Sequence, residues 1–181
     1  MQIHEETLRR FSSQHKIIKH YIDDLPPEGI YKRLDPTKWS IHENIAYLCR
    51  YQQVFMDRIH QILNEVNPYF TIYQPEDDPE LRYTTAKTTG SLLHCLYRIR
   101  HELTIMFEDL SPEYFARIGV HPRMGKMNIP QWLEFFLLHE SNQLFKIFKL
   151  SGRFWTAENT TDENIIYMPG IQNNVVDDLA G

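Results

Sequence analysis

Four long segments of the chain repeat apolar residues every three or four positions. That spacing places the apolar side chains on one face of a helix and leaves polar residues on the others. The four segments cover about residues 4–23, 40–67, 87–110 and 129–152. Between them there is no sustained alternation of apolar and polar residues of the kind that marks a β-strand. The pattern therefore predicts an all-α protein, built as an antiparallel four-helix bundle.

Capping signals predict where the second and fourth helices begin. Ser40 and Glu43 have the spacing of a capping box, in which the hydroxyl and the carboxylate each satisfy a free backbone amide at the helix start. Asn128 is placed to cap the fourth helix, with Gln131 three residues later and Pro130 in the first turn, where a missing N–H costs nothing. We expect both helices to start at these residues.

Prolines and glycines predict the connections and one helix end. Residues 26–38 and 67–83 are rich in proline or acidic residues, and we expect irregular surface connections there. Gly152 is placed to end the fourth helix. We therefore expect two parts, a helical bundle of residues 1–155 and an acidic, irregular tail of residues 156–181 that packs on the bundle or extends from it.

The distribution of charge argues against nucleic acid as a partner. Up to residue 155 the chain has 19 acidic and 19 basic side chains, so the bundle is neutral. The formal net charge of −5 comes from the acidic residues of the tail, which are Glu158, Asp162, Glu163, Asp177 and Asp178. A protein that grips phosphates needs clustered cations. We expect no binding to DNA or RNA.

Length and composition fit a cytoplasmic globular protein. Of 181 residues, 42% are hydrophobic, which suffices for a packed core. No apolar run approaches the roughly 20 residues of a membrane helix, and the N-terminal residues lack the apolar stretch of a signal peptide. Cys49 and Cys95 both fall within helical segments, where we expect free thiols in a reducing compartment. The sequence predicts no membrane partner.

His139 and Gln143 form the most suggestive pair on the fourth helix. They are four residues apart, so both project from one face, with Phe136 one turn before and Ile147 one turn after. Two polar side chains in an apolar stripe need partners inside the bundle. Two imidazoles at this spacing present two nitrogens to a metal ion, but a glutamine amide is a poor ligand for zinc or nickel.

Tyr47 and Tyr51 form a second pair four residues apart, on the second helix. In a functional interpretation, their hydroxyls join His139 and Gln143 in a polar pocket that hydrogen-bonds a small ligand. In a structural interpretation, they pack as core aromatics whose hydroxyls reach water or one partner. The structural interpretation is favoured for Tyr51, and both remain open for Tyr47.

Other histidines offer weaker alternatives. His42 lies five residues before Tyr47 and points about 140° away around the helix, so it cannot replace Tyr47 in a site. His94 and His101 share a face of the third helix, where we favour an exposed position over a meeting with His139. His121 either lines a pocket mouth or packs in its connector. The chain has no phosphate-binding loop, no His-Glu-x-x-His and no Gly-x-Ser-x-Gly motif.

Three segments together resemble the DinB-like family of four-helix bundles. They are Trp39–Glu43 (WSIHE), His121–Asn128 (HPRMGKMN) and Trp132–Gln143 (WLEFFLLHESNQ). The resemblance covers about residues 4–150. It implies an antiparallel bundle, often a dimer, in which many members hold a divalent metal on three histidines. In some members it implies metal-assisted transfer of a thiol onto an electrophile, or a hydrolase-like activity.

The resemblance places the three metal-binding positions at Tyr47, His139 and Gln143, so only one of them is a histidine. The first hypothesis is a metal-free bundle that binds a small ligand or has a regulatory role, with no cofactor and a pocket formed by these residues and Tyr51. The second is an enzyme that uses nickel or zinc, with His139 as a ligand beside His94, His101 or water. A third makes the chain an oligomer-forming bundle without a site. Under each we expect a homodimer.

Overall fold

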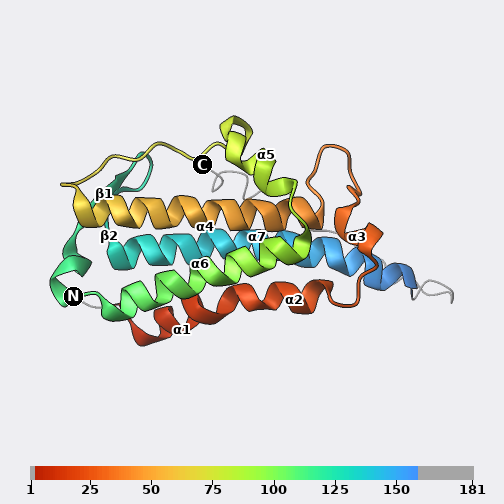
Figure 1. Cartoon of the computed structure of the whole chain (residues 1–181), viewed down its shortest axis with the longest axis horizontal. Helices are drawn as coiled ribbons and strands as arrows, with labels where there is room; N and C mark the ends of the chain where they lie inside the picture. The colour runs from red at the N-terminus through yellow and green to blue at the C-terminus, as the bar shows by residue number, and fades with distance from the viewer. Residues whose placement is uncertain (1–2, 159–181) are drawn as a thin grey trace, which may run out of the picture.

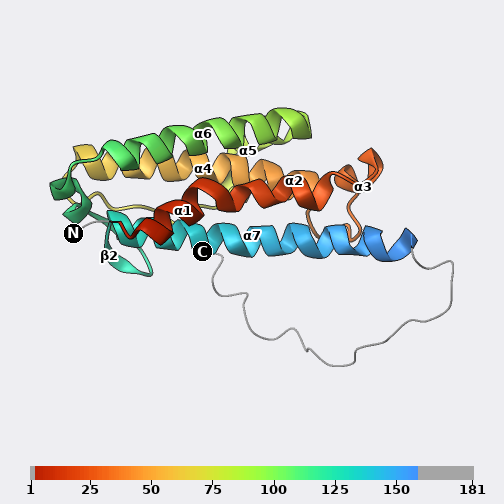
Figure 2. The ribbon, with the colours of Figure 1, turned by 90° about the horizontal axis from the view of Figure 1, so that it is seen from below.

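Four long helical stretches run side by side in the computed structural model, which describes residues 3–158 (Figure 1). The first stretch is α1 (Glu5–Ser13), a 3-10 turn (Gln14–Lys16) and α2 (Ile17–Ile22); the others are α4 (Ile41–Asn64), α6 (Thr89–Asp109) and α7 (Ile129–Glu158). In the turned view, α7 lies along one side of the bundle and α6 along the other (Figure 2). The predicted all-α bundle is confirmed.

The capping predictions are also confirmed. The Ser40 hydroxyl accepts from the Glu43 amide at 3.2 Å, and the Glu43 carboxylate accepts from the Ser40 amide at 2.8 Å. Asn128 Oδ1 accepts from the Gln131 amide, and Gln131 Oε1 accepts from the Asn128 amide, both at 3.0 Å. These reciprocal bonds satisfy free N–H groups at the start of α4 and α7.

The first helix is interrupted where the sequence predicts continuity. Arg100 of α6 donates to the carbonyl oxygen of Phe11 at 2.7 Å. In an unbroken α-helix that oxygen would accept from residue 15. The tighter 3-10 turn at Gln14–Lys16 follows this contact. Because Arg100 comes from a distant part of the chain, local periodicity could not reveal the break.

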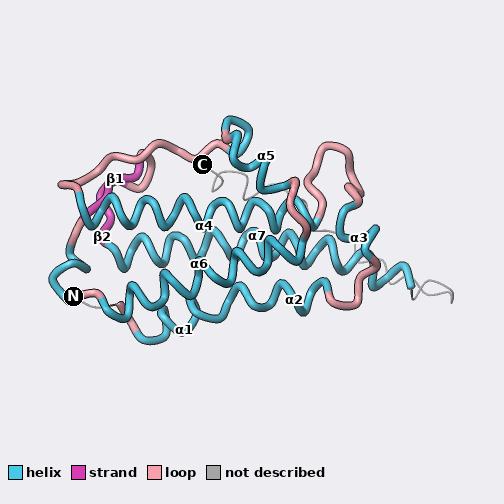
Figure 3. The backbone as a smooth tube through the Cα atoms, viewed as in Figure 1, coloured by secondary structure: helices cyan, strands magenta, loops and turns pink. Residues whose placement is uncertain are grey.

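The predicted connections contain additional short elements. These are α3 (Pro27–Tyr31), a 3-10 turn (Pro75–Asp77), α5 (Pro79–Thr85), a 3-10 turn (Pro112–Ala116), β1 (Ile118–His121) and β2 (Gly125–Asn128). The two strands pair antiparallel at the end of the bundle where α7 begins (Figure 3). Gly125, the first residue of β2, has a φ of +74°, which favours glycine where the chain leaves the tight turn. Strands of four residues are too short to show alternation in the sequence.

The prediction that Gly152 ends the fourth helix was wrong, since α7 continues to Glu158. A glycine inside a helix costs only about 1 kcal/mol relative to alanine. Leu150 and Phe154 pack against a core cluster on either side of it, and Ser151 is buried. The favourable free energy of this packing outweighs the cost of the glycine within the helix. The predicted irregular tail is therefore helical at residues 156–158, and residues 159–181 lie outside the described part of the chain.

A buried ion pair joins α6 and α7 in the middle of the bundle. Arg100 and Glu140 are each 1% exposed and hydrogen-bond directly. Gln52 of α4 accepts from Arg100 at 2.7 Å, and Gln14 donates to Glu140 at 3.0 Å. The pair thus forms hydrogen bonds with both of the other two helical stretches, which satisfies charges that would otherwise be costly to bury.

None of the helices within residues 3–158 has an apolar stretch long enough to cross a membrane.

Candidate functional site

α4 and α7 bring Tyr47 and His139 into direct contact, which is one of the two interpretations that the sequence left open for Tyr47. The Tyr47 hydroxyl lies 2.9 Å from Nε2 of His139. The ring of Tyr51 stacks on the imidazole with centroids 4.0 Å apart and an angle of 26° between the planes. Tyr51 is 6% exposed, as the structural interpretation expects of a core aromatic. His139 therefore meets one tyrosine edge-on through its nitrogen and the other through its face.

Both partners of this hydrogen bond are uncharged at neutral pH. Burial lowers the pKa of His139 to about 4, and the positive charges of Lys146 and Arg58 act in the same direction. Burial raises the pKa of Tyr47 far above its ordinary value, with a smaller contribution from Tyr51. At neutral pH the imidazole is therefore neutral and the phenol protonated. Whichever of the two groups donates, Nε2 of His139 is engaged with the Tyr47 hydroxyl and offers a metal ion no free lone pair.

Gln143 is buried beside this pair but does not hydrogen-bond with it. The residue is 3% exposed, and its Oε1 atom has no hydrogen-bond partner among the described residues. A buried carbonyl without a donor costs about 1–3 kcal/mol. The predicted cluster of Tyr47, His139 and Gln143 thus contains one satisfied pair and one acceptor still open to a donor.

Aromatic residues from the connections cover the pair. Tyr73 packs against Tyr47 with ring centroids 6.0 Å apart, and Trp39 packs against Tyr47 at 5.3 Å. The Tyr73 hydroxyl donates to Asp78 at 2.7 Å, and Arg50 of α4 donates to the same carboxylate oxygen at 2.6 Å. Burial opposes ionisation of Asp78, but these hydrogen bonds outweigh it and lower the pKa of the carboxyl. Hydrogen bonds through Asp78 therefore hold the segment around Tyr73 against α4.

A groove of about 620 Å³ lies between α4 and the segment of residues 69–79. Its lining includes Arg50, Arg58, Tyr73 and Asp78. Tyr73 is shared by the groove and by the aromatic cover of Tyr47, so the groove adjoins the His139 cluster. A separate hollow of about 470 Å³ is lined by Trp39, Glu43, Arg82 and neighbouring residues.

Arg58 is a buried cation on the wall of this groove. It is 7% exposed and donates to the carbonyl of Thr71 at 2.9 Å. Its guanidinium carbon lies 5.5 Å from the ring centre of Phe70 and 5.8 Å from that of Trp132. Burial raises the pKa of Tyr51, and the positive charge of Arg58 opposes this rise. Within residues 3–158 no carboxylate lies at ion-pair distance from Arg58.

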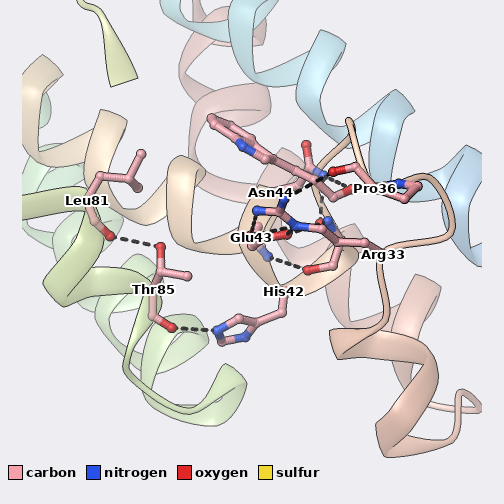
Figure 4. A network of polar contacts seen from close by, with 9 residues as sticks. Arg33, Pro36, His42, Glu43, Asn44, Leu81 and Thr85 are labelled. Atoms are coloured by element: carbon pink, nitrogen blue, oxygen red, sulfur yellow. Dashed lines mark hydrogen bonds and ion pairs between the residues drawn. The ribbon is translucent and has the colours of Figure 1, made fainter. Parts of the chain in front are cut away.

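His42 and Glu43 have structural roles away from the site (Figure 4). The two ring nitrogens of His42 lie 2.9 Å from the Thr85 carbonyl and 2.9 Å from the Thr89 hydroxyl. Glu43 accepts from Arg33 at 2.9 Å while it caps α4. The prediction that His42 cannot replace Tyr47 agrees with this geometry, because both ring nitrogens are used toward α5 and α6.

The remaining histidines do not join His139. His94 and His101 are exposed on α6, as the favoured interpretation expected. His121 is 3% exposed, and its Nδ1 accepts from the amides of Arg123 and Met124 at 3.2 and 3.1 Å. It therefore packs and holds the hairpin turn. The described residues contain no group of three or more His, Cys, Asp or Glu side chains that could hold a metal ion.

The donor set at the three family positions does not fit zinc or nickel. His139 supplies one imidazole, whose Nε2 is bonded to Tyr47. Tyr47 is a protonated phenol, and Gln143 offers a neutral amide oxygen. Zinc and nickel prefer imidazole, thiolate or carboxylate. The second hypothesis would require other ligands, and His94 and His101 are not placed to supply them.

Sequence reasoning missed Arg58 and Tyr73. Arg58 lies seven residues after Tyr51 and eleven after Tyr47, so all three share a face of α4. That spacing is the feature of the sequence that could have identified Arg58 as a neighbour of the two tyrosines. Tyr73 lies in a connection without periodicity, and nothing in the sequence ties it to the site.

Comparison with known proteins agrees with the resemblance. The family model of the DinB superfamily matches residues 10–144. No curated protein matches the chain. A solved structure, YfiT from Bacillus subtilis, is similar with a TM-score of 0.73 at 16% sequence identity, over 83% of this chain and 87% of that one. YfiT is described as a probable metal-dependent hydrolase with an unusual four-helix bundle topology. At this identity the likeness shows the fold.

Proposed function

This chain belongs to the DinB superfamily, and we propose that it binds a small organic molecule without using a metal ion at the family's metal position. The observation that carries the proposal is the hydrogen bond of 2.9 Å between the Tyr47 hydroxyl and Nε2 of His139. A metal ion at this nitrogen would have to displace that bond. It would also meet only one imidazole, since Tyr47 and Gln143 stand at the other two positions.

The groove beside the His139 cluster supports a binding role. Its volume of about 620 Å³ falls within the range of small-molecule sites. Tyr73 connects the groove to the cluster, because it lines the groove and its ring packs on Tyr47 and Tyr51. Arg58 forms a second link, because it lines the groove and its positive charge acts on Tyr51, which in turn stacks on His139. Occupation of the groove can therefore act on the cluster, which is the basis for a regulatory role.

Arg58 indicates the chemical class of the ligand. A buried guanidinium that pairs with no carboxylate still has N–H groups to donate. Two of them can bind the two oxygens of one ligand carboxylate. The groove is also lined by Asp57, Asp77 and Asp78, whose negative charge disfavours a phosphate dianion. A small organic molecule with a single carboxylate fits both facts. We assign its carboxylate to Arg58 and its apolar part to the rings of Phe70 and Tyr73.

Thermal melts test this assignment. The full-length protein, purified without a histidine tag, is melted with a panel of small monocarboxylic acids and with the matching primary amides. An acid present at one hundred times its Kd stabilises the folded state by about 2.7 kcal/mol. For a domain of this size, that shifts the melting temperature by about 5–10 °C. We expect shifts with some acids and none with their amides.

Two arginine variants provide the control. Arg58→Lys keeps the charge but loses the planar fork, so it should remove most of the shift. Arg98→Gln removes an exposed arginine that pairs with Glu102, and it should leave the shift intact. If acids and amides act alike, or if both variants behave as the parent does, the Arg58 assignment is wrong.

The same melts distinguish the metal-dependent alternative. His139 stands at a family ligand position, so a divalent enzyme would show a shift in nickel, zinc or manganese that His139→Ala removes. We expect no such shift. A metal-dependent shift lost in His139→Ala would replace the binding proposal with the enzyme hypothesis.

A further inference from the structure

A stripe of large apolar side chains lies exposed along α7. Leu138, Phe145 and Phe148 are 65%, 55% and 42% exposed. Their spacing of seven and then three residues places them on one face of the helix. Phe148 also packs against Tyr21 of α2, with ring centroids 5.4 Å apart, so this α7 stripe borders α2. Apolar side chains that gather on one exposed face mark a contact surface, whereas scattered ones need no explanation.

The α7 stripe lies apart from the small-molecule groove. That groove lies between α4 and residues 69–79. The stripe lies on the border of α7 with α2, and α7 runs along one side of the bundle (Figure 2). Occupation of the stripe is therefore independent of the small-molecule proposal.

The charges around the α7 stripe are positive. Between Glu140, which is buried, and Glu158, α7 carries three basic residues and no acidic one. The Lys149 ammonium lies 4.9 Å from the ring centre of Phe145, within the stripe itself. Residues 16–24 beside it add no net charge, since two lysines there are matched by two aspartates. A partner that complements this face combines apolar side chains with negative charge.

The chain after Glu158 has that composition. Residues 159–181, here called the C-terminal segment, contain four acidic residues and no basic one. Two of the acids, Asp162 and Glu163, stand directly before an apolar run at residues 165–168 (IIYM). The C-terminal segment thus offers negative charge and apolar side chains next to each other, as the stripe requires.

The length of the chain allows this apolar run to reach the stripe. Seven residues lead from Glu158 to Ile165, and they span about 23 Å when extended. On the helix, Phe148 and Phe145 lie ten and thirteen residues before Glu158, which is about 15 and 20 Å back along the axis. A chain that reverses after α7 therefore brings residues 165–168 level with both phenylalanines.

We propose that the C-terminal segment folds back and docks on the α7 stripe, with residues 165–168 over Phe145 and Phe148 and the carboxylates of Asp162 and Glu163 beside Lys149. Burial of apolar surface drives the docking. Exposed ion pairs contribute little to its strength, so the charges serve mainly to set the register. Because the segment is tethered to α7, its effective concentration is on the order of millimolar, and a weak contact keeps it bound.

Carbodiimide coupling of the full-length protein tests this docking. The reagent joins an ammonium directly to a carboxylate, so only groups in contact react. Trypsin then releases the chain after Arg153 as one peptide, since no basic residue follows, and mass spectrometry identifies the lysine coupled to it. We expect coupling to Lys149 several-fold above coupling to Lys87 or Lys126, which are exposed on other parts of the fold.

Serine substitutions separate docking from simple attraction between charges. Phe145→Ser should lower the coupling to Lys149 several-fold, and so should Ile165→Ser combined with Ile166→Ser. Ile105→Ser is the matched control, because Ile105 is 43% exposed on α6, and it should leave the coupling unchanged. Phe145 and Ile105 are both exposed, so neither change opens the core, which circular dichroism checks.

Three results would overturn the proposal. Equal coupling to Lys149, Lys87 and Lys126 would mean that the C-terminal segment takes no fixed position. Coupling that survives Phe145→Ser would mean that the apolar stripe does not hold it. In a mixture of unlabelled and nitrogen-15-labelled protein, cross-links that join a light chain to a heavy one would assign the stripe to a second copy of the chain.

Discussion

The buried ion pair of Arg100 and Glu140 offers a direct test of how the bundle is held together, through Glu140→Gln. The variant keeps the shape of the side chain and removes its charge. Arg100 is 1% exposed and would be left with neutral partners, namely Gln52, the Phe11 carbonyl and the ring of His15. An uncompensated buried charge of this kind costs about 3–5 kcal/mol. Since domains are stable by about 5–15 kcal/mol in total, the loss should be severe.

Urea unfolding followed by circular dichroism measures this loss. Glu134→Gln is the matched control, because Glu134 lies on the same helix, is 43% exposed and pairs with Arg10 at 3.3 Å. An exposed pair contributes only about 0–1 kcal/mol. Replacing both buried partners, as in Arg100→Met with Glu140→Leu, should recover much of the stability. If Glu140→Gln costs no more than Glu134→Gln, the charge of Glu140 does not stabilise the bundle.

Three further predictions concern pH, the site and the glycines. Burial lowers the pKa of His139 to about 4 and that of His15 to about 3. Below pH 6.5 these histidines are therefore protonated in the unfolded chain while they remain neutral in the folded protein. The free energy of unfolding should therefore fall as the pH drops from 6.5 toward 4, and the slope of urea-derived stability against pH should be shallower in His139→Gln; an unchanged slope would show that His139 titrates normally. Tyr47→Phe removes the hydrogen-bond partner of His139 and should cost about 1 kcal/mol in the same assay, so a fully stable variant would contradict the hydrogen bond. Gly119→Ala should cost about 1–3 kcal/mol because a Cβ would lie 2.7 Å from Phe70, whereas Gly90→Ala meets nothing within 4 Å and should gain about 0.5–1 kcal/mol; melts in which the two behave alike would refute the close approach.

The sequence predicted those parts of the fold that depend on local contacts. Apolar periodicity and the reciprocal caps at Ser40 and Asn128 involve residues within a few positions of one another, and all were confirmed. The break in the first helix depends on Arg100, and the extension of α7 past Gly152 depends on the packing of Phe154. Both effects come from elsewhere in the fold, so no local pattern could predict them.

In the candidate site, too, some residues could be named from the sequence and others depended on contacts between distant parts of the chain. The contact of Tyr47 with His139 was one of two open interpretations, because the resemblance named both positions but did not fix what the tyrosine contacts. Arg58 lies on the same face of α4 as Tyr47, but no motif in the sequence pointed to it. Glu140 and Arg100 were missed for a physical reason: a charged residue within a helix is usually solvated, and only the opposing helix shows that these two neutralise each other in the core.

Metal content tests the central claim most directly. The full-length protein, purified without a histidine tag, is examined by elemental analysis and melted with nickel, zinc and manganese. Tyr47→His combined with Gln143→His, which would place three imidazoles around the site, is the positive control. We predict far less than one metal per chain and no shift for the parent, and a shift of several degrees for the double variant. Near-stoichiometric metal in the parent, lost in His139→Ala, would contradict a metal-free site.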